Sequence, residues 1–396
     1  MNAILVINSG SSSIKLQLIK MPSETVVASG LIERIGLENS ALHLQTGKNK
    51  ISEEMNIPDH ESGLKEITRM LMDKERGVIS NTSDIMAVGH RVVHGGSAFS
   101  DTIEVNEEVK KSIRDLFSLA PLHNPPNYKG IEVCEKIFPE ARQVAVFDTA
   151  FHQSIPTRAK KYAIPNEFHD KYQLQVYGFH GISHKYVSER AMEFLKKPKG
   201  KFITIHLGNG CSMTAVKNGK SIDHSLGFGP VNGLIMGTRS GDIDQSVIFY
   251  MIEKLGFSAS EVSDLLHKKS GMLGLTGFSD LRDIEQRAEQ GDEMCQLALE
   301  MNAYRIKKYI GAYIAAMNGV DAIVFTAGIG ENSNVLRELV CRDMDYLGIA
   351  LEPYKNNIRA KEPRVISKES SKVSVLVIPT NEELEIAKQA YELLQG

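Results

Sequence analysis

Residues 4–16 read ILVINSGSSSIKL, and residues 202–217 read FITIHLGNGCSMTAVK. In both stretches an apolar run ends at a turn of small residues, and a second apolar run leaves that turn. A further strand pattern follows each copy, ETVVASGLI after the first and KSIDHSLG after the second. The second is entered through Asn218-Gly219, a strong hairpin signal. We interpret the copies as an internal duplication of an α/β domain that opens with a β-meander; the alternative is two unrelated hairpins.

Length and composition are those of a globular protein of about two domains. The chain has 396 residues, of which 42% are apolar and 24% charged. Its net charge of −3 shows no basic excess that would favour binding to nucleic acid. We expect an N-terminal domain of residues 1–150, joined by a C-terminal helix of about 384–396. The second domain is expected over residues 151–383.

The cellular location is predicted from what the sequence lacks. Four cysteines lie far apart without a C-x-x-C motif, which favours free thiols in a reducing compartment. The start of the chain has neither the basic region nor the cleavage site of a signal peptide, and no long apolar run follows. We therefore expect a cytoplasmic protein.

Strand and helix patterns alternate over the rest of the chain. Residues 61–75 place apolar side chains at helical spacing, and residues 293–319 form a longer helical pattern. Residues 142–152 are a strand pattern, and residues 321–333 are a strand followed by a turn, which leads into a helix at 334–340. This alternation predicts a largely parallel sheet with helices on both faces. Ligands of such sheets bind beyond the carboxyl ends of the strands.

Three small-residue turns close strand patterns, namely NSGSSS (8–13), HLGNGCS (206–212) and TAGIGENS (326–333). The third is a poor nicotinamide fingerprint because Ser333 stands where the last glycine is required, and no P-loop motif occurs. Three such turns together favour a phosphate chain bound by backbone N–H groups, since glycine permits close approach. Lys15 could add a positive charge.

Several polar residues stand in apolar or glycine-rich settings: Arg91, His123, Asp148, His180 and Arg239. Taken singly, each has an ordinary explanation as an ion-pair partner or a structural histidine. Two histidine pairs, at 90/94 and 180/184, have a spacing seen in zinc sites, but neighbouring glycines disfavour a helix there and H-E-x-x-H is absent. Two arginines and histidines in glycine-rich loops instead fit an anionic substrate and a phosphoryl group in transfer.

Nine motifs in order, from residue 8 to residue 383, resemble the acetate kinase family: NSGSSSIK, GHRVVHGG, LHNPPN, FDTAFH, YGFHGISH, HLGNGCS, MGTRSGD, GIGENS and PTNEE. The resemblance implies an α/β fold of two duplicated ribonuclease-H-like domains of the actin and sugar-kinase type, with a cleft between them. It implies a homodimer that transfers the γ-phosphoryl of ATP to acetate with Mg²⁺, or Mn²⁺ as a substitute, giving acetyl phosphate and ADP. No nucleic acid or membrane partner is expected.

The resemblance also implies the site residues. Asn8 and Glu382 would hold the metal, Glu382 being chosen over Glu383 by motif position alone. Arg91 would bind the acetate carboxylate, Arg239 and His180 would neutralise the transferring phosphoryl group, and His123 would lie close by. The ATP phosphates would be bound by Lys15, His206, Leu207, Gly208, Asn209 and Gly210. The nucleoside would be bound by Asp280, Leu281, Arg282, Gly328, Ile329, Gly330, Glu331 and Asn332. The apolar wall around the acetate methyl would be Val93, Leu122, Phe179 and Pro230.

The resemblance makes Asp148 catalytic, but acetate is already ionised at neutral pH because the pKa of such a carboxyl is about 4.3. We therefore expect Asp148 to orient the metal or fix an arginine rather than to act as a general base. Three alternatives remain open. They are a kinase for propionate or another short-chain carboxylate, a sugar or polyol kinase with Asp148 as a true base, and a non-catalytic nucleotide switch of the actin or chaperone type.

Overall fold

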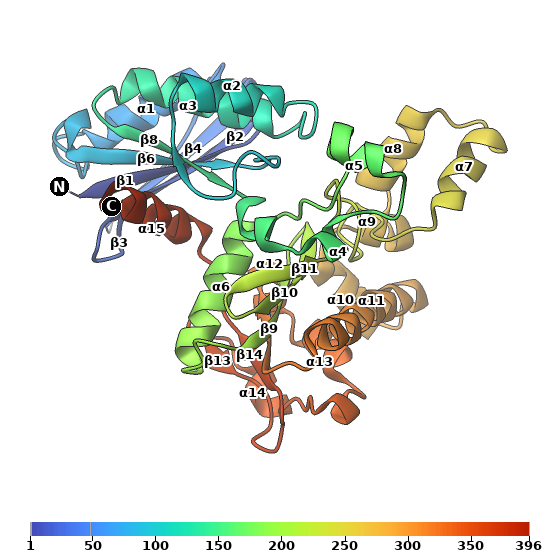
Figure 1. The fold of residues 1–396 in the computed structure, drawn as a ribbon. Coiled ribbons are helices and arrows are strands. Elements are labelled where there is room, and N and C mark those ends of the chain that lie inside the picture. Colours follow the sequence, from blue (N-terminus) through green and yellow to red (C-terminus); the bar gives the residue numbers. More distant parts are fainter. Residues whose placement is uncertain (1, 48, 396) are drawn as a thin grey trace. The chain divides into compact units, whose positions relative to one another are not determined.

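The computed structural model describes residues 2–47 and 49–395 and divides the chain into two compact units (Figure 1). The first unit comprises residues 1–151 and 381–396, and the second comprises residues 152–380. Met1 and Gly396, at the ends of the predicted N-terminal domain, lie outside the described residues. No helix in the described part of the chain is both long and apolar enough to cross a membrane.

The first unit is built on an eight-stranded sheet in the order β5-β4-β3-β2-β1-β6-β8-β7. Strands β1 to β5 form an antiparallel meander, β6 and β8 continue the sheet parallel to β1, and β7 pairs antiparallel with β8. The strands are β1 (Ala3–Ser9), β2 (Ser13–Lys20), β3 (Thr25–Glu33), β4 (Ser40–Thr46), β5 (Asn49–Met55), β6 (Ile85–Val92), β7 (Ile103–Glu104) and β8 (Arg142–Phe147).

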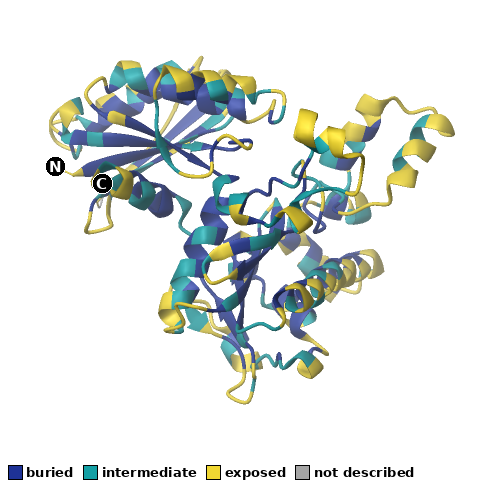
Figure 2. Cartoon of the chain, in the orientation of Figure 1, coloured by how far each residue is buried: buried dark blue, intermediate teal, exposed yellow. Residues whose placement is uncertain are grey.

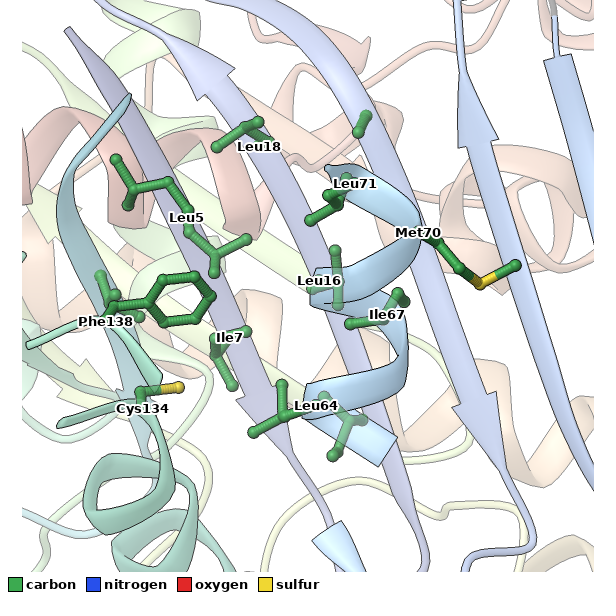
Figure 3. Close-up of a cluster of buried hydrophobic side chains, with 14 of the residues drawn as sticks. Leu5, Ile7, Leu16, Leu18, Leu64, Ile67, Met70, Leu71, Cys134 and Phe138 are labelled. Atoms are coloured by element: carbon green, nitrogen blue, oxygen red, sulfur yellow. The ribbon is translucent and has the colours of Figure 1, made fainter. Parts of the chain in front are cut away.

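Helices cover both faces of this sheet. On one face, α1 (His60–Leu71) and α3 (Asn124–Ile137) pack their apolar sides on the strands, and α2 (Glu107–Asp115) lies beside α3. Figure 3 shows the resulting core, in which side chains of β1 and β2 meet those of the two helices: Leu5, Ile7, Leu16, Leu18, Leu64, Ile67, Met70, Leu71, Cys134 and Phe138.

The other face is covered by the C-terminal helix α15 (Glu382–Gln395) (Figure 1). A Cβ atom at Gly89 of β6 would lie 2.8 Å from the side chain of Ile386, so a glycine is needed for this helix to pack so closely. The first turn of α15 thereby comes to the carboxyl ends of the parallel strands, where the site described below is built.

The second unit has a six-stranded sheet in the order β11-β10-β9-β12-β14-β13. In Figure 1, α6 (Gly181–Phe194) lies on one face and α11 (Glu293–Met317) on the other. The strands are β9 (Lys201–Leu207), β10 (Cys211–Lys217), β11 (Lys220–His224), β12 (Ala322–Thr326), β13 (Arg364–Val365) and β14 (Ser374–Val377). The shorter helices are α4 (Thr157–Lys160), α5 (Asn166–Tyr172), α7 (Gln245–Glu253), α8 (Ala259–Lys268), α9 (Gly271–Thr276), α10 (Leu281–Glu289), α12 (Ala327–Asn332), α13 (Asn334–Cys341) and α14 (Pro353–Asn357).

The two sheets share one topology, and this confirms the predicted duplication. The segment β3-β2-β1-β6-β8 of the first unit has the same order and strand directions as β11-β10-β9-β12-β14 of the second. Figure 2 shows the central strands of both sheets buried, while the outward sides of the helices are exposed. Each unit therefore has its own core.

Two local predictions are wrong. Both sheets are mixed rather than largely parallel, because a tight turn such as Asn218-Gly219 can join only antiparallel strands. The GIGEN segment is the short helix α12 rather than a turn. This turn of helix packs against the end of β12, since a Cβ at Gly330 would lie 3.4 Å from the Phe325 backbone. The helix forms although its two glycines have low helix propensity.

Candidate functional site

In the first unit, an arginine and an aspartate from neighbouring parallel strands form a two-pronged ion pair. Arg91 lies near the end of β6, and Asp148 directly follows β8. The Arg91 Nε and Nη2 atoms donate to the two Asp148 carboxylate oxygens at 3.2 and 2.5 Å. Asp148 is 1% exposed. Such bidentate contacts fix a guanidinium in both position and orientation.

Two further oxygen-bearing side chains gather around the same guanidinium. The Arg91 Nη1 donates to the Asn8 Oδ1 at 3.2 Å, and the Arg91 Nε lies 4.0 Å from the Glu382 Oε2. Burial raises the pKa of Glu382 to about 7, an effect that Arg91 opposes and Asp148 reinforces. Asn8, Asp148 and Glu382 come from segments far apart in the chain and meet at one end of the sheet.

The adjacent glutamate takes a different partner. Glu383 lies 2.6 Å from the Lys15 Nζ, and Lys15 is the cross-strand neighbour of Asn8. Of the two glutamates that begin α15, Glu382 therefore belongs to the Arg91 cluster and Glu383 to the lysine. Motif position alone had favoured Glu382. Lys15 lies in the first unit, whereas the other predicted nucleotide residues lie in the second.

The donor set of the Arg91 cluster suits magnesium. Mg²⁺ prefers oxygen ligands, keeps several waters, and is usually held by one or two carboxylates together with substrate phosphates. Asn8, Asp148 and Glu382 offer one amide oxygen and two carboxylates around a single point. Among the described residues, no group of three or more His, Cys, Asp or Glu side chains is placed to bind a metal by itself.

Two asparagines that the sequence did not single out hold this part of the first unit together. The Asn127 side chain donates to the Ser9 carbonyl at 2.6 Å and accepts from the Val93 N–H at 3.1 Å. Asn124 makes the same two kinds of bond with the backbone of His94, at 2.9 and 3.0 Å. The NSGSSS turn is thereby tied to the segment after β6. The sequence feature that could have indicated both asparagines is their place in the LHNPPN motif.

In the second unit, His180 stands in a left-handed backbone conformation at the start of α6, with φ of 56°. Its ring stacks on that of His206 with the centroids 4.4 Å apart, and its Nδ1 lies 2.8 Å from the Ser212 Oγ. A Cβ at Gly210 would lie 3.4 Å from the His180 Nε2 and 3.8 Å from the Arg239 Nη1. The predicted residues His180, His206, Gly210 and Arg239 therefore converge on the turn between β9 and β10.

Arg239 is held by neutral groups. Its Nη1 donates to the Pro230 carbonyl at 3.0 Å, and within the described residues no carboxylate lies within ion-pair distance of its guanidinium. Burial lowers the pKa of Arg239, although an arginine remains charged at neutral pH. A largely buried cation without a counter-ion favours binding of an anion.

Three more histidines surround this point, and none was predicted as a site residue, although His152 ends the FDTAFH motif and His184 ends YGFHGISH. The His184 ring bonds to Thr204 at 2.7 Å and to Ser212 at 2.8 Å, whereas His152 and His224 lie behind Phe179. Burial lowers the pKa of His152 to about 4, and it lowers the pKa values of His184 and His224 well below the usual 6.5. These three rings are therefore neutral at pH 7.

A cavity of about 710 Å³ opens beside the β9–β10 turn, α10, α12 and α13. Eight of the predicted nucleotide residues line it: Gly208, Asn209, Asp280, Leu281, Arg282, Gly328, Ile329 and Asn332. Asp280 caps α10 and pairs with Arg282 at 2.5 Å, and this hydrogen-bonded pair lowers the pKa of Asp280 to about 2. Five other lining residues were not predicted to bind the nucleotide: Ser279, Glu285, Ser333, Asn334 and Arg359.

Of the residues predicted to bind the nucleoside, Gly330 and Glu331 are absent from the cavity lining. The Gly330 carbonyl accepts from the buried Arg337 side chain at 2.8 Å, and the Glu331 carboxylate accepts from the Thr380 N–H at 3.1 Å. Because α12 is helical, its residues point in different directions around the helix axis, and positions 328, 329 and 332 lie on one side. Gly330 and Glu331 brace this helix, while Gly328, Ile329 and Asn332 face the cavity.

The predicted apolar wall is divided between the units. Val93 and Leu122 belong to the first unit, and Phe179 and Pro230 belong to the second. Val93 and Phe179 are buried, whereas Leu122 is 68% exposed. His123 is exposed at the start of α3, next to Leu122.

Fold and site together define a class of protein. Two α/β units of one topology, one with an oxygen and arginine cluster and the other with a glycine-rich cavity beside an unpaired arginine, are typical of the phosphotransferases with a duplicated ribonuclease-H-like fold.

Comparison with known proteins identifies the family within that class. The model of the acetokinase family matches residues 3–388. The chain is 62% identical over 393 residues to an acetate kinase of Flavobacterium johnsoniae, covering 99% of this chain and 100% of that protein. It is 54% identical over 394 residues to one of Carboxydothermus hydrogenoformans, covering 99% of each. The chain belongs to the acetokinase family.

Solved structures agree with this assignment. The crystal structure of Porphyromonas gingivalis acetate kinase matches with a TM-score of 0.94 and 47% identity, covering 100% of both chains. A propionate kinase from Francisella tularensis matches with a TM-score of 0.92 and 42% identity, covering 98% of this chain and 99% of that one.

Proposed function

We propose that the protein is an acetate kinase that transfers the γ-phosphoryl group of ATP directly and reversibly to acetate, giving acetyl phosphate and ADP. The observation that carries the proposal is Arg239, a largely buried guanidinium beside His180 and the Gly210 turn with no carboxylate partner among the described residues. In phosphoryl transfer, charge spreads over the equatorial oxygens, and cationic groups stabilise it. Arg239 and His180 have this role in the proposal, with His123 assisting.

The nucleotide binds in the cavity beside the glycine-rich turn. The nucleoside contacts Asp280, Leu281, Arg282, Gly328, Ile329 and Asn332, with Gly330 and Glu331 supporting the helix that carries the last three. The ATP phosphates are bound by His206, Leu207, Gly208, Asn209, Gly210 and Lys15. The position of Gly210 supports this role, because a side chain there would crowd the two groups assigned to the phosphoryl.

Acetate is bound through Arg91. Three of its five N–H groups are accounted for by Asp148 and Asn8, and this leaves one on each terminal nitrogen for a carboxylate. Val93, which lies two residues further along, contacts the acetate methyl together with Leu122, Phe179 and Pro230. A longer acyl chain is disfavoured by this wall.

Asp148 acts by holding Arg91 rather than by removing a proton. Both of its carboxylate oxygens accept hydrogen bonds from the guanidinium, and the acceptor substrate is already ionised at neutral pH. The resulting fixed arginine presents its remaining donors without reorganisation during the reaction.

Asn8 and Glu382 hold Mg²⁺, with Asp148 beside them, and Mn²⁺ can substitute because it also prefers oxygen ligands. When bound, the metal neutralises charge on the phosphate oxygens. A magnesium titration of Asn8→Ala checks the assignment, since turnover should fall and its magnesium dependence weaken. Unchanged kinetics would remove Asn8 from the metal site.

A single assay tests the proposal. The protein is incubated with ATP, Mg²⁺, hydroxylamine and one carboxylate at a time, and acyl hydroxamates are measured. Acetate should give the highest kcat/KM, propionate a lower one, and butyrate the lowest. A preference for propionate would favour the alternative short-chain kinase. If no carboxylate gives a hydroxamate, ADP release with a sugar as the acceptor would favour a sugar kinase. Nucleotide binding without transfer to any acceptor would favour a nucleotide switch.

We further propose a homodimer that acts in the cytoplasm. Helix α11 carries a row of exposed apolar residues at helical spacing, Met294, Leu297, Met301 and Tyr304, and α7 exposes Phe249 and Tyr250. Light scattering of the wild type and of Leu297→Glu measures the assembly; a monomeric wild type would contradict it. The cytoplasmic location is supported by four buried free cysteines, which suit a reducing compartment.

A further inference from the structure

The backbone of Phe179 is held on both sides by imidazole rings. Its N–H donates to the His224 Nε2 at 3.1 Å, and its carbonyl accepts from the His152 Nε2 at 3.0 Å. The residues before and after it, Gly178 and His180, both have left-handed backbone conformations, with φ of 73° and 56°. Both peptide groups that flank Phe179 are thus fixed by histidines.

These contacts determine the proton positions on the two rings. The His224 Nε2 faces a backbone N–H, so it is the unprotonated nitrogen, and the Nδ1–H donates to the Thr214 Oγ1 at 2.8 Å. The His152 Nε2 faces a carbonyl oxygen and therefore carries the proton, while its Nδ1 accepts from the Ser221 hydroxyl at 2.9 Å. The two neutral rings are therefore opposite tautomers.

The rings pack directly against each other and against Gly178. Their centroids are 4.1 Å apart, and both rings are almost wholly buried. A Cβ at Gly178 would lie 2.7 Å from the His152 ring and 3.0 Å from the His224 ring. The segment therefore reaches this position only because residue 178 lacks a side chain and because neither ring carries a charge that would repel the other.

The two hydrogen bonds that join His152 and His224 to the Phe179 backbone determine the position of His180. A left-handed conformation is unfavourable for a residue with a side chain and persists only when surrounding bonds enforce it. In that conformation His180 bonds to the Ser212 Oγ, which also bonds to His184. The carbonyl bonded by His152 belongs to the peptide that joins Phe179 to His180, so releasing it frees the backbone of His180.

We propose that His152 and His224 are positioning residues that hold the Phe179–His180 backbone for phosphoryl transfer through their opposite tautomers. The inference rests on the proposed function only in that His180 acts on the phosphoryl group and Phe179 on the acyl group. Neither His152 nor His224 contacts a substrate in this proposal.

The tautomers are tested without any activity measurement. Protein labelled with ¹⁵N-histidine is examined at pH 7 by long-range proton–nitrogen correlation, and the two rings are assigned from the signals lost in His152→Gln and His224→Gln. We expect His152 to carry its proton on Nε2 and His224 on Nδ1. Equal tautomers, or a charged ring, would overturn the proposal even if the protein proves to be an active kinase.

Kinetics test the positioning role. His152→Leu and His224→Leu remove the bonds to Phe179 and should lower kcat by about 100-fold, the cost of displacing a reacting group by roughly 1 Å. The KM for ATP should be unchanged, because the nucleoside-binding cavity is lined by other elements. Glutamine places an amide where the Nε2 atom stands and can either donate or accept, so the Gln variants should recover most of kcat.

His267→Leu on α8 is the matched control, because its ring is half-buried in the same unit and bonds only within its own helix. A Leu variant of His152 or His224 that melts earlier but retains kcat would show a purely structural role and overturn the proposal. If the Leu variants do not fold, the Gln variants replace them in this test. A folded Gln variant whose kcat does not recover toward the wild-type value would then overturn the proposal. A wild type that forms no hydroxamate would refute the proposed function while leaving the tautomer result intact.

Discussion

Arg91 and Arg239 lie at corresponding ends of two sheets of the same topology, yet their surroundings differ in charge. Arg91 has a bidentate carboxylate partner in Asp148 and a second carboxylate, Glu382, at 4.0 Å. Arg239 has a backbone carbonyl as a partner and, among the residues that the structure describes, no carboxylate. A duplicated fold therefore determines where a site is built but not its electrostatics, which depend on the side chains placed at the strand ends.

In the second unit, the groups around the site are polar but neutral, so they do not balance the charge of Arg239. His152, His184 and His224 are buried with lowered pKa values, and serine and threonine hydroxyls satisfy their ring nitrogens. Buried polar groups are tolerated when they are hydrogen-bonded, and neutral ones add no counter-ion. In the proposed function, the first unit therefore binds the cation and orients an arginine, whereas the second binds the anionic phosphoryl group.

Asp148→Asn breaks the first side of this comparison and should have the largest effect. It leaves the mostly buried Arg91 without its main counter-ion, which should lower the free energy of unfolding by about 3 kcal/mol. The guanidinium is then no longer held in place, and kcat/KM for acetate should fall by roughly a hundredfold. The measurement is acetate kinetics by the hydroxamate assay, together with a melting curve. Asp101→Asn, an exposed aspartate of the same unit, is the control, and an unchanged kcat/KM in Asp148→Asn would exclude a role for the pair.

Truncating each arginine in turn sharpens the comparison. Loss of a charged contact to substrate costs about 1.5–3 kcal/mol, which is about 10- to 150-fold. Arg91→Ala should mainly raise the KM for acetate, because Arg91 binds the ground state. Arg239→Ala should mainly lower kcat, because the phosphoryl oxygens need it most during transfer. Arg69→Ala on the surface of α1 is the control, and equal effects of both changes on KM alone would contradict distinct roles.

Val93→Ala tests whether the charged cluster of the first unit has an apolar neighbour. If Val93 contacts the acetate methyl, the added space should raise kcat/KM for propionate relative to acetate by roughly tenfold, chiefly through KM. Both acids are measured beside a melting curve, with Val78→Ala as a control in the same unit. A well-folded Val93→Ala variant with an unchanged ratio would remove Val93 from the acyl site.

Because the buried histidines are neutral, we predict that the free energy of unfolding depends on pH. This is the smallest of the four effects. Burial lowers the pKa of His152 to about 4, far below the 6.5 of an unfolded chain, so the unfolded state binds more protons between these values. This stability is present above pH 6.5 and is lost as the pH falls toward 4. Each such histidine contributes at most about 1.4 kcal/mol per pH unit.

His90 and His94 of the first unit, whose pKa values burial also lowers to about 4, add to the same slope. Melting temperatures measured from pH 7 to pH 5 should therefore fall, and less steeply in His224→Gln than in the wild type. An equal slope in His224→Gln would mean that its ring is not held neutral by folding.

Patterns of short range were predictable from the sequence. The two meanders, helix α1 and helix α11 follow from apolar spacing and from turn residues such as Asn218-Gly219, since both depend on neighbours a few positions apart. The glycine-rich turn at Gly210 was also predicted at a strand end, where it lies. The parallel character of the sheets was overestimated because a tight turn joins antiparallel strands, and each sheet contains several.

Contacts between distant segments were decided by tertiary structure. Asp148 meets Arg91 across 57 positions because β6 and β8 are parallel neighbours in register, and no local pattern encodes that register. The packing of α15 on the sheet separates the roles of Glu382 and Glu383, which are adjacent in the sequence.

The kinds of residue at the site could thus be recognised from the sequence alone, because glycine, arginine and histidine gathered at strand ends are seldom explained by packing alone. Their partners were decided only by the fold, because strand register and helix packing bring together residues that the chain keeps apart. His152 and His224 show this most clearly. His152 ends the FDTAFH motif and His224 lies in the KSIDHSLG strand pattern, but neither stretch indicates what the ring bonds to, and each ring acquires its proton position from the backbone of Phe179.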